Sequence, residues 1–128
     1  MQIKQKLIGT FFLAPTNVQL YAKRSDSGGE FYFSPDDKSL PRIKACVDYA
    51  QWDDCLAVLL HESFEYLMTA RKLRYVDPGK MSGDSADFLF IFNHSQFSDI
   101  CAAQAYFLQF AIPALRKEWE RAQPKKRK

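Results

Sequence analysis

The stretch WDDCLAVLLHESFEYLMTARK, residues 52–72, decides the fold because the hydrophobic pattern changes there from the period of strands to that of a helix. It contains neither Gly nor Pro. Asp53 and Asp54 lie near its start and Arg71 and Lys72 near its end, the charge order that a helix dipole favours. We therefore predict a central, mostly buried helix whose main apolar stripe comprises Leu56, Leu60, Phe64 and Leu67.

The residues before this helix have the alternating pattern and the turn residues of β-strands. The turn-forming run at residues 25–29 (SDSGG) predicts that the strands on either side of it form a hairpin. The expected strands cover residues 3–13, 18–22, 30–34 and 40–47.

Three features are expected after the helix. Residues 77–86 have the composition of a loop, and the apolar run at 88–92 predicts a buried strand that joins the sheet. Ser95, with Ser98 or Asp99, is expected to start a long helix over 97–121, which Pro113 should kink or restart. The predicted fold class is α+β: a small, mainly antiparallel sheet packed on a central helix, with a long C-terminal helix covering one side.

Composition predicts one soluble domain over residues 1–122, followed by a disordered basic tail at 123–128. The chain has 128 residues, of which 47% are hydrophobic and 26% charged, and its net charge is +3. Its three cysteines, Cys46, Cys55 and Cys101, are odd in number and form no CxxC pair, which favours buried, reduced thiols in the cytoplasm. No apolar run has the length of a membrane span or the layout of a signal peptide.

The run LLHESFE, residues 59–65, carries the main candidate for chemistry. His61 and Glu65 lie four residues apart and therefore share one helix face, where they could hold a single metal ion. His94, the only other histidine, is the candidate third ligand, with Asp99 or Asp87 as substitutes. Zinc accepts imidazole and carboxylate ligands, and Glu62 would then take the proton of a zinc-bound water.

An alternative interpretation needs no metal. His61 and Glu65 can hydrogen-bond each other as a polar pair on the helix, while Glu62 and His94 face solvent. Cysteine chemistry has less support, because Cys55 and Cys101 lie among apolar residues and form no helical neighbour pair with a histidine.

The order of elements and the run LLHESFE resemble a minimal zincin-type metallopeptidase. His61 matches the first zinc ligand of that family and Glu62 its catalytic glutamate, whereas Glu65 replaces the second histidine of HExxH. The runs HESFE at 61–65 and NHSQFS at 93–98 also resemble small proteins encoded by tailed phages. These resemblances imply a zinc peptidase or amidase on the one hand, and on the other a phage accessory protein that binds a host protein or peptide in the host cytoplasm.

The tail PKKRK, residues 124–128, resembles a nuclear-import signal and also suits phosphate backbones. We favour a solubilising C-terminus, because no second basic stripe is apparent in the sequence. Nucleic acid is thus not an expected partner apart from this tail, and neither is a membrane. The leading hypothesis is a binding protein on a zincin-like scaffold; the alternative is a zinc-dependent hydrolase.

Overall fold

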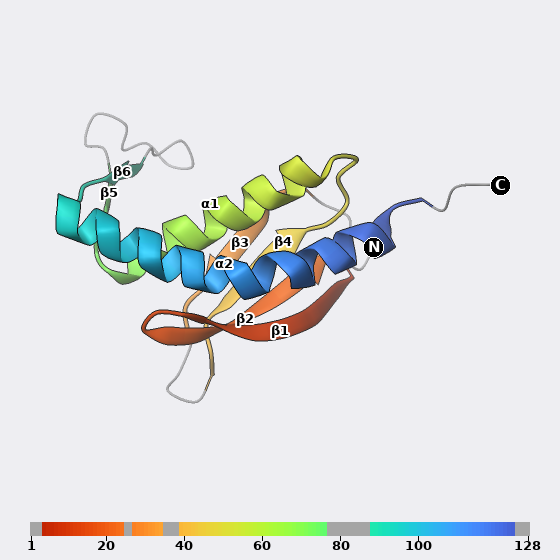
Figure 1. Cartoon of the computed structure of the whole chain (residues 1–128), viewed down its shortest axis with the longest axis horizontal. Helices are drawn as coiled ribbons and strands as arrows, with labels where there is room; N and C mark the ends of the chain where they lie inside the picture. The colour runs from red at the N-terminus through yellow and green to blue at the C-terminus, as the bar shows by residue number, and fades with distance from the viewer. Residues whose placement is uncertain (1–3, 25–26, 35–38, 77–87, 125–128) are drawn as a thin grey trace.

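The computed structural model describes residues 4–24, 27–34, 39–76 and 88–124. Within them the fold is α+β, as predicted, with a four-stranded sheet, a separate two-stranded sheet and two long helices (Figure 1). The strands of the larger sheet are β1 (Gln5–Leu13), β2 (Thr16–Lys23), β3 (Gly29–Tyr32) and β4 (Arg42–Cys46).

The strand order is β1-β2-β4-β3, so the predicted hairpin between β2 and β3 is wrong. β4 lies between these two strands and pairs parallel with β2 and antiparallel with β3. The turn signal in the sequence at 25–29 therefore does not determine which strand pairs with which. The observed register places Leu20 beside Ile43 and Phe31 beside the same Ile43, which aligns apolar residues of three strands on the helix side.

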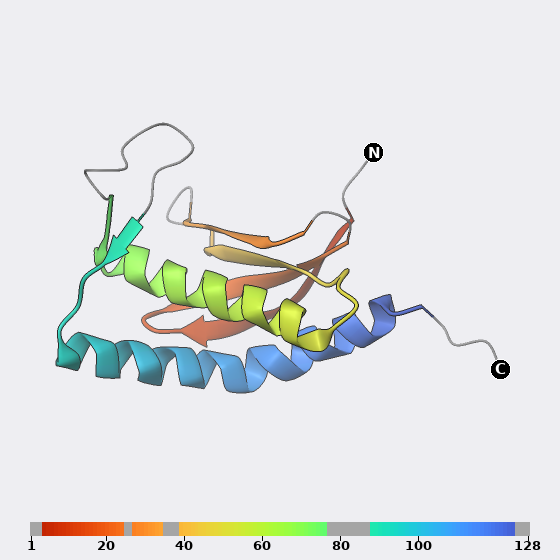
Figure 2. The same cartoon turned by 90° about the horizontal axis from the view of Figure 1, so that it is seen from above.

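Both helices cover the same face of the sheet (Figure 2). α1 (Trp52–Ala70) packs on β3 and β4, and α2 (His94–Ala122) packs on β1, with the two helices side by side and running in opposite directions. The core fills the space between these layers. Its largest fully buried side chains include Leu13, Leu20, Ile43, Leu59, Leu67, Met68, Ile100, Phe107 and Leu115.

The buried stripe of α1 differs from the predicted one. Cys55, Leu59 and Ser63 are buried, whereas Leu60 is 39% exposed and Leu56 and Phe64 are only partly buried. Apolar residues surround much of this helix, so their pattern alone does not fix which side faces the sheet. α2 contributes to the same contact, because the Gln104 side chain donates to the Leu60 carbonyl at 3.1 Å and to Ser63 Oγ at 3.0 Å.

The apolar run at 88–92 is neither buried nor part of the main sheet, contrary to the prediction. β6 (Phe88–Phe90) pairs antiparallel with β5 (Arg74–Val76), a strand that the sequence pattern did not indicate. β5 follows α1 after a left-handed residue, Lys72 (φ 60°), and lies at the end of that helix rather than beside the sheet. The predicted loop at 77–86 falls outside the described residues.

α2 begins earlier than predicted. Asn93 is its N-cap and accepts from the Gln96 backbone N–H at 2.9 Å, while the Gln96 side chain accepts from the Asn93 N–H at 2.8 Å. This capping box replaces the expected cap at Ser95. Pro113 lies inside a helix that continues to Ala122 and curves along its length (Figure 2). Neither described helix is long and apolar enough to cross a membrane.

Candidate functional site

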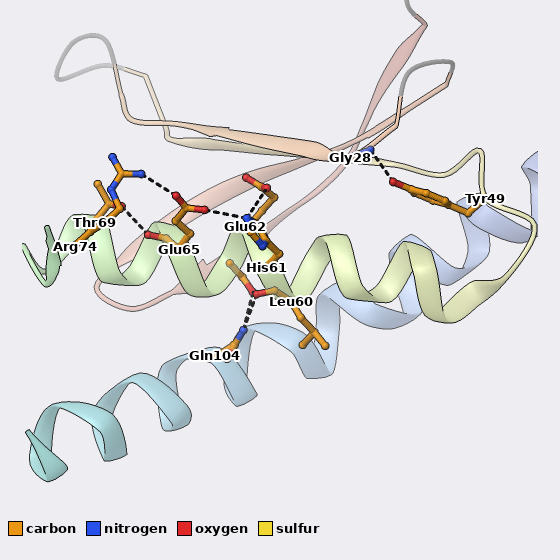
Figure 3. A network of polar contacts seen from close by, with 10 residues as sticks. Gly28, Tyr49, Leu60, His61, Glu62, Glu65, Thr69, Arg74 and Gln104 are labelled. Atoms are coloured by element: carbon orange, nitrogen blue, oxygen red, sulfur yellow. Dashed lines mark hydrogen bonds and ion pairs between the residues drawn. The ribbon is translucent and has the colours of Figure 1, made fainter. Parts of the chain in front are cut away.

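His61 and Glu65 meet on α1 as their spacing predicts. The Nε2 atom of His61 lies 3.0 Å from Oε2 of Glu65 (Figure 3). The imidazole is 67% exposed, so the pair sits at the surface rather than in an apolar interior. The other carboxylate oxygen of Glu65 is held by Arg74, whose Nη1 lies 2.8 Å from Oε1. Both oxygens of Glu65 are therefore already engaged by side chains of the protein.

Glu62 is the buried carboxyl of the site. Its side chain is only 9% exposed, and His61 Nε2 lies 3.8 Å from its Oε2. Burial raises the pKa of Glu62 above its ordinary value, with Glu65 and Glu30 adding to the rise, while His61 and Lys23 oppose it. Glu62 thus holds a proton more readily than a solvated glutamate.

The sheet lies close to α1 at this point because Gly29 has no side chain. A Cβ at Gly29 would lie 2.6 Å from the Lys44 carbonyl oxygen, 2.7 Å from Val58 Cγ1 and 2.9 Å from Glu62 Cγ. A shallow depression opens beside it, lined by Gly28, Gly29, Ala57, Val58, His61 and Glu62. The exposed imidazole of His61 and the buried carboxyl of Glu62 therefore line the same depression.

Lys23 and Glu30 form a second ion pair on the sheet side of Glu62. Lys23 is 5% exposed, and its Nζ lies 3.5 Å from Oε1 of Glu30. Glu30 also accepts from the hydroxyl of Tyr32. This hydrogen bond lowers the pKa of Glu30; Lys23 and Lys44 lower it further, while desolvation opposes them. The pKa of Glu30 is therefore lowered and that of Glu62 raised, although both carboxyls lie near Lys23.

His94, the expected third ligand, is not brought to this pair. It is the exposed first residue of α2, while Gln104 is the residue of α2 that contacts α1 at Leu60. Ten residues of helix separate His94 from Gln104, about 15 Å along the axis. Asp99 is exposed and lines a different depression, with Ala14 and Arg71, and Asp87 falls outside the described residues.

Two features of the described arrangement bear on the predicted zinc site. No group of three His, Cys, Asp or Glu side chains within the described ranges is placed to hold a metal ion. The guanidinium of Arg74 occupies one oxygen of Glu65, and its positive charge would oppose a cation at that carboxylate. The contact between His61 and Glu65 is common to both interpretations. His94 is exposed, as the alternative interpretation expects, but Glu62 is buried, which contradicts its expectation that Glu62 faces solvent.

The cysteines divide into two kinds. Cys46 and Cys55 are buried, and burial together with Cys46 raises the pKa of the Cys55 thiol to about 12, which leaves it protonated and unreactive. Cys101 is exposed on α2, which corrects the expectation that it is buried. The buried face of α2 includes the preceding residue, Ile100, and Cys101 therefore lies outside that face.

Sequence reasoning missed Arg74, Lys23 and Gly29. Arg74 follows the predicted helix and belongs to a strand that the pattern did not indicate, so no spacing rule connects it to Glu65. Lys23 directly follows an expected strand, residues 18–22, and had no predicted partner. Gly29 was assigned to the turn at 25–29, but it is the first residue of β3, and glycine in a strand often marks the close approach of another segment.

No protein-family model matches this chain, and no curated protein or solved structure is found to be similar to it. The resemblances to zincins and to phage-encoded proteins accordingly stay predictions.

Proposed function

We propose that this protein is a non-catalytic binding module that recognises an extended, apolar segment of a partner protein. The observation that carries the proposal is a set of exposed apolar side chains at the end of the molecule formed by β5, β6 and the start of α2. We call this set the apolar end; it comprises Tyr75, Val76, Phe88, Leu89, Phe90, Ile91, Phe92 and Phe97.

The exposure of the apolar end is unusual for a folded surface. Each of its eight side chains is 36–59% exposed, and five of them are consecutive in the sequence, from Phe88 to Phe92. The strand pairing places Tyr75 and Leu89 on one face of the β5–β6 ribbon and Val76, Phe88 and Phe90 on the other. Exposed apolar side chains gathered in one region are typical of interaction sites, because single scattered apolar residues are ordinary but large groups are rare.

The geometry of the apolar end supports recognition by a preorganised surface. The rings of Phe92 and Phe97 stack with centroids 5.8 Å apart and an interplanar angle of 12°. The guanidinium of Arg74 lies 4.2 Å from the centroid of Phe88. Aromatic rings and arginine dominate the binding energy of many interfaces, and rings already held in place lose little entropy on binding.

The strands of this end favour an extended partner. In the described part of the chain β6 pairs with β5 alone, so the pair has open edges to which another strand can add its backbone. If the chain is encoded by a phage, as its resemblance implies, the partner is a host protein in the host cytoplasm.

The alternative function, a zinc-dependent peptidase or amidase with Glu62 as general base, is favoured by one observation. Glu62 has a pKa raised by burial and lies beside His61 in an open depression, as a carboxyl that exchanges protons with a bound substrate would. The Arg74–Glu65 ion pair and the position of His94 argue against it, and we therefore place the binding module first.

The binding module is tested with displayed random peptides of about twelve residues, selected against the full chain. We expect apolar sequences that bind the protein, and Leu89→Ser and Ile91→Ser to weaken that binding by about tenfold or more, since each loses about 1.4 kcal/mol or more of contact. Phe110→Ser is the matched control, because Phe110 is 50% exposed on α2 outside the apolar end.

Selected peptides that bind Ile91→Ser as tightly as the unaltered protein would overturn the proposal. Sedimentation of the free protein over a range of concentrations supplies a second readout. A dimer that Ile91→Ser dissociates would mean that a second copy, rather than a foreign segment, covers the apolar end.

A further inference from the structure

The main sheet has a second face, which is turned away from both helices (Figure 2). Side chains alternate along a strand, so the strand neighbours of Leu20, Phe31 and Ile43, which point to the helices, project to this second face. The pairing register aligns these neighbours in two rows across β2, β4 and β3. We call the six residues the open face: Tyr21, Lys44 and Glu30 form one row, and Gln19, Arg42 and Tyr32 form the other.

The open face carries positive charge that the protein does not neutralise. The acid among its six residues, Glu30, is paired with Lys23, whose Nζ lies 3.5 Å from Oε1. Arg42 and Lys44 make no ion pair with any residue in the described ranges, and they lie over the ring of Tyr32, at 6.0 Å and 5.2 Å from its centroid. The open face therefore keeps two positive charges that are available to an anionic ligand.

Two tyrosines flank these cations. Tyr21 on β2 and Tyr32 on β3 lie on either side of β4, the strand that carries Arg42 and Lys44. Tyr32 is 41% exposed and its hydroxyl donates to Glu30, so its ring is accessible and is already held in position. A side chain that is held in this way loses little entropy when a flat group stacks on it.

From this arrangement of rings around free cations we infer that the open face binds a single-stranded nucleic acid. The phosphates of the strand pair with Arg42 and Lys44, and its unstacked bases stack on Tyr21 and Tyr32. An acidic peptide would match the charges but would leave the rings without a flat partner. No basic stripe is apparent in the sequence because the cations and rings come from three strands, which the order β2-β4-β3 brings together.

The inference is independent of the proposed partner-binding surface. The open face belongs to the four-stranded sheet, whereas the apolar end is built from the separate sheet of β5 and β6 and from the start of α2 (Figure 1). The two surfaces share no residue. Failure of either proposal therefore leaves the other standing.

The test is fluorescence anisotropy of labelled single strands of about twelve nucleotides, titrated with the full chain over a range of salt concentrations. We expect the logarithm of affinity to fall linearly with the logarithm of salt. The slope should shrink by up to about 1.4 in Arg42→Gln/Lys44→Gln, since each phosphate contact contributes about 0.7. Tyr21→Leu and Tyr32→Leu should each weaken binding by about tenfold through lost stacking and leave the slope unchanged. Comparison of DNA with RNA strands identifies the preferred sugar.

Matched controls change the same residue types away from the open face. Lys72→Asn/Lys117→Gln removes two exposed charges, one beyond the end of α1 and one on α2; Lys72 has a φ of 60°, a conformation that asparagine tolerates. Tyr106→Leu removes a ring that is 51% exposed on α2. Both controls should bind with the affinity and slope of the unaltered protein.

Three outcomes would overturn the inference. The first is an unaltered protein that does not bind single strands at low salt. The second is an Arg42→Gln/Lys44→Gln variant whose slope equals that of the unaltered protein, which would exclude the open face. The third is equal affinity for a competitor: a duplex of the same length would exclude stacking of unpaired bases, and a poly-glutamate peptide would indicate an acidic protein instead.

Discussion

Arg74 and Glu65 are joined by an ion pair of 2.8 Å between the strand β5 and the C-terminal half of α1. Both side chains are largely shielded from solvent, with 25% and 16% of their surfaces exposed. Arg74 thus occupies one oxygen of the Glu65 carboxylate, which the sequence analysis predicts to be a metal ligand. His61 contacts the other oxygen of the same carboxylate. Through Arg74, Glu65 connects the C-terminal half of α1 to β5, which belongs to the apolar end.

The first prediction concerns zinc. We expect protein purified without a polyhistidine tag to have no stoichiometric zinc, because Arg74 opposes a cation at Glu65. Arg74→Met should increase affinity for added zinc by at least tenfold, since it frees the carboxylate oxygen and removes a positive charge. Elemental analysis and titration against a chromophoric zinc chelator provide the two measurements.

His61→Ala is the control for the zinc experiment, because it removes the only histidine near Glu65. Stoichiometric zinc in the unaltered protein that disappears in His61→Ala would refute the prediction. It would also favour the alternative function, a zinc-dependent peptidase or amidase. In that case Glu62→Gln should abolish the hydrolytic activity while the protein retains the metal.

The second prediction follows from the raised pKa of Glu62. The folded protein binds a proton at this carboxyl more tightly than the unfolded chain does, so the stabilising contribution is fully present below the ordinary pKa of 4.5. It is lost as pH rises through the raised value, because the charged form must then be buried. Urea unfolding should therefore show that Glu62→Gln gains stability relative to the unaltered protein as pH rises from 4 towards 7.

The same urea unfolding series is measured for Glu65→Gln, which removes the charge of a second glutamate of α1. Parallel pH profiles for Glu62→Gln and the unaltered protein would show that burial of Glu62 has no energetic consequence.

The third prediction tests the start of α2. Asn93→Ala removes the capping box and should lower the free energy of unfolding by about 1 kcal/mol. Ser95→Ala is the matched control, since Ser95 was the cap expected from sequence and is an exposed residue of the first turn; its effect should stay within about 0.5 kcal/mol. Chemical denaturation of both variants measures the difference, and equal losses would contradict the observed cap.

The fourth prediction concerns the approach of β3 to α1. Gly29→Ala should destabilise the protein by about 1–3 kcal/mol, because the new methyl group would overlap the backbone oxygen of Lys44. Gly28→Asn separates this steric effect from a conformational one: Gly28 has a φ of +84° but nothing within 4 Å of its Cβ position. If Gly29→Ala unfolds at the same denaturant concentration as the unaltered protein, the close contact is not present in solution.

The sequence predicted the elements better than their arrangement. Period and capping residues are local properties, and they located α1, α2 and the strands of the main sheet to within a few residues. The position of β4 between β2 and β3 depends on contacts between segments far apart in the chain, and no local turn signal encodes it. The apolar run at Phe88–Phe92 was misplaced for a related reason: an exposed apolar segment and a buried strand can have the same composition.

The candidate site divides in the same way. The contact between His61 and Glu65 follows from helical spacing, and the structure contains it at 3.0 Å. Arg74, which pairs with Glu65, and Gly29, which lies against Glu62, come from two strands, β5 and β3. His94 was linked to the site by residue type alone, without a spacing argument, and it lies at a distant helix end.

The strand order has a consequence for how the chain reaches its native state. The sheet consists of two antiparallel pairs, β1–β2 and β3–β4, joined along a single parallel boundary between β2 and β4. Each pair can form from neighbouring segments, whereas the boundary requires two preformed pieces to dock. We therefore expect the chain to tolerate cleavage between β2 and β3 and to reassemble from the two fragments, with the docking of these pieces as the slow step.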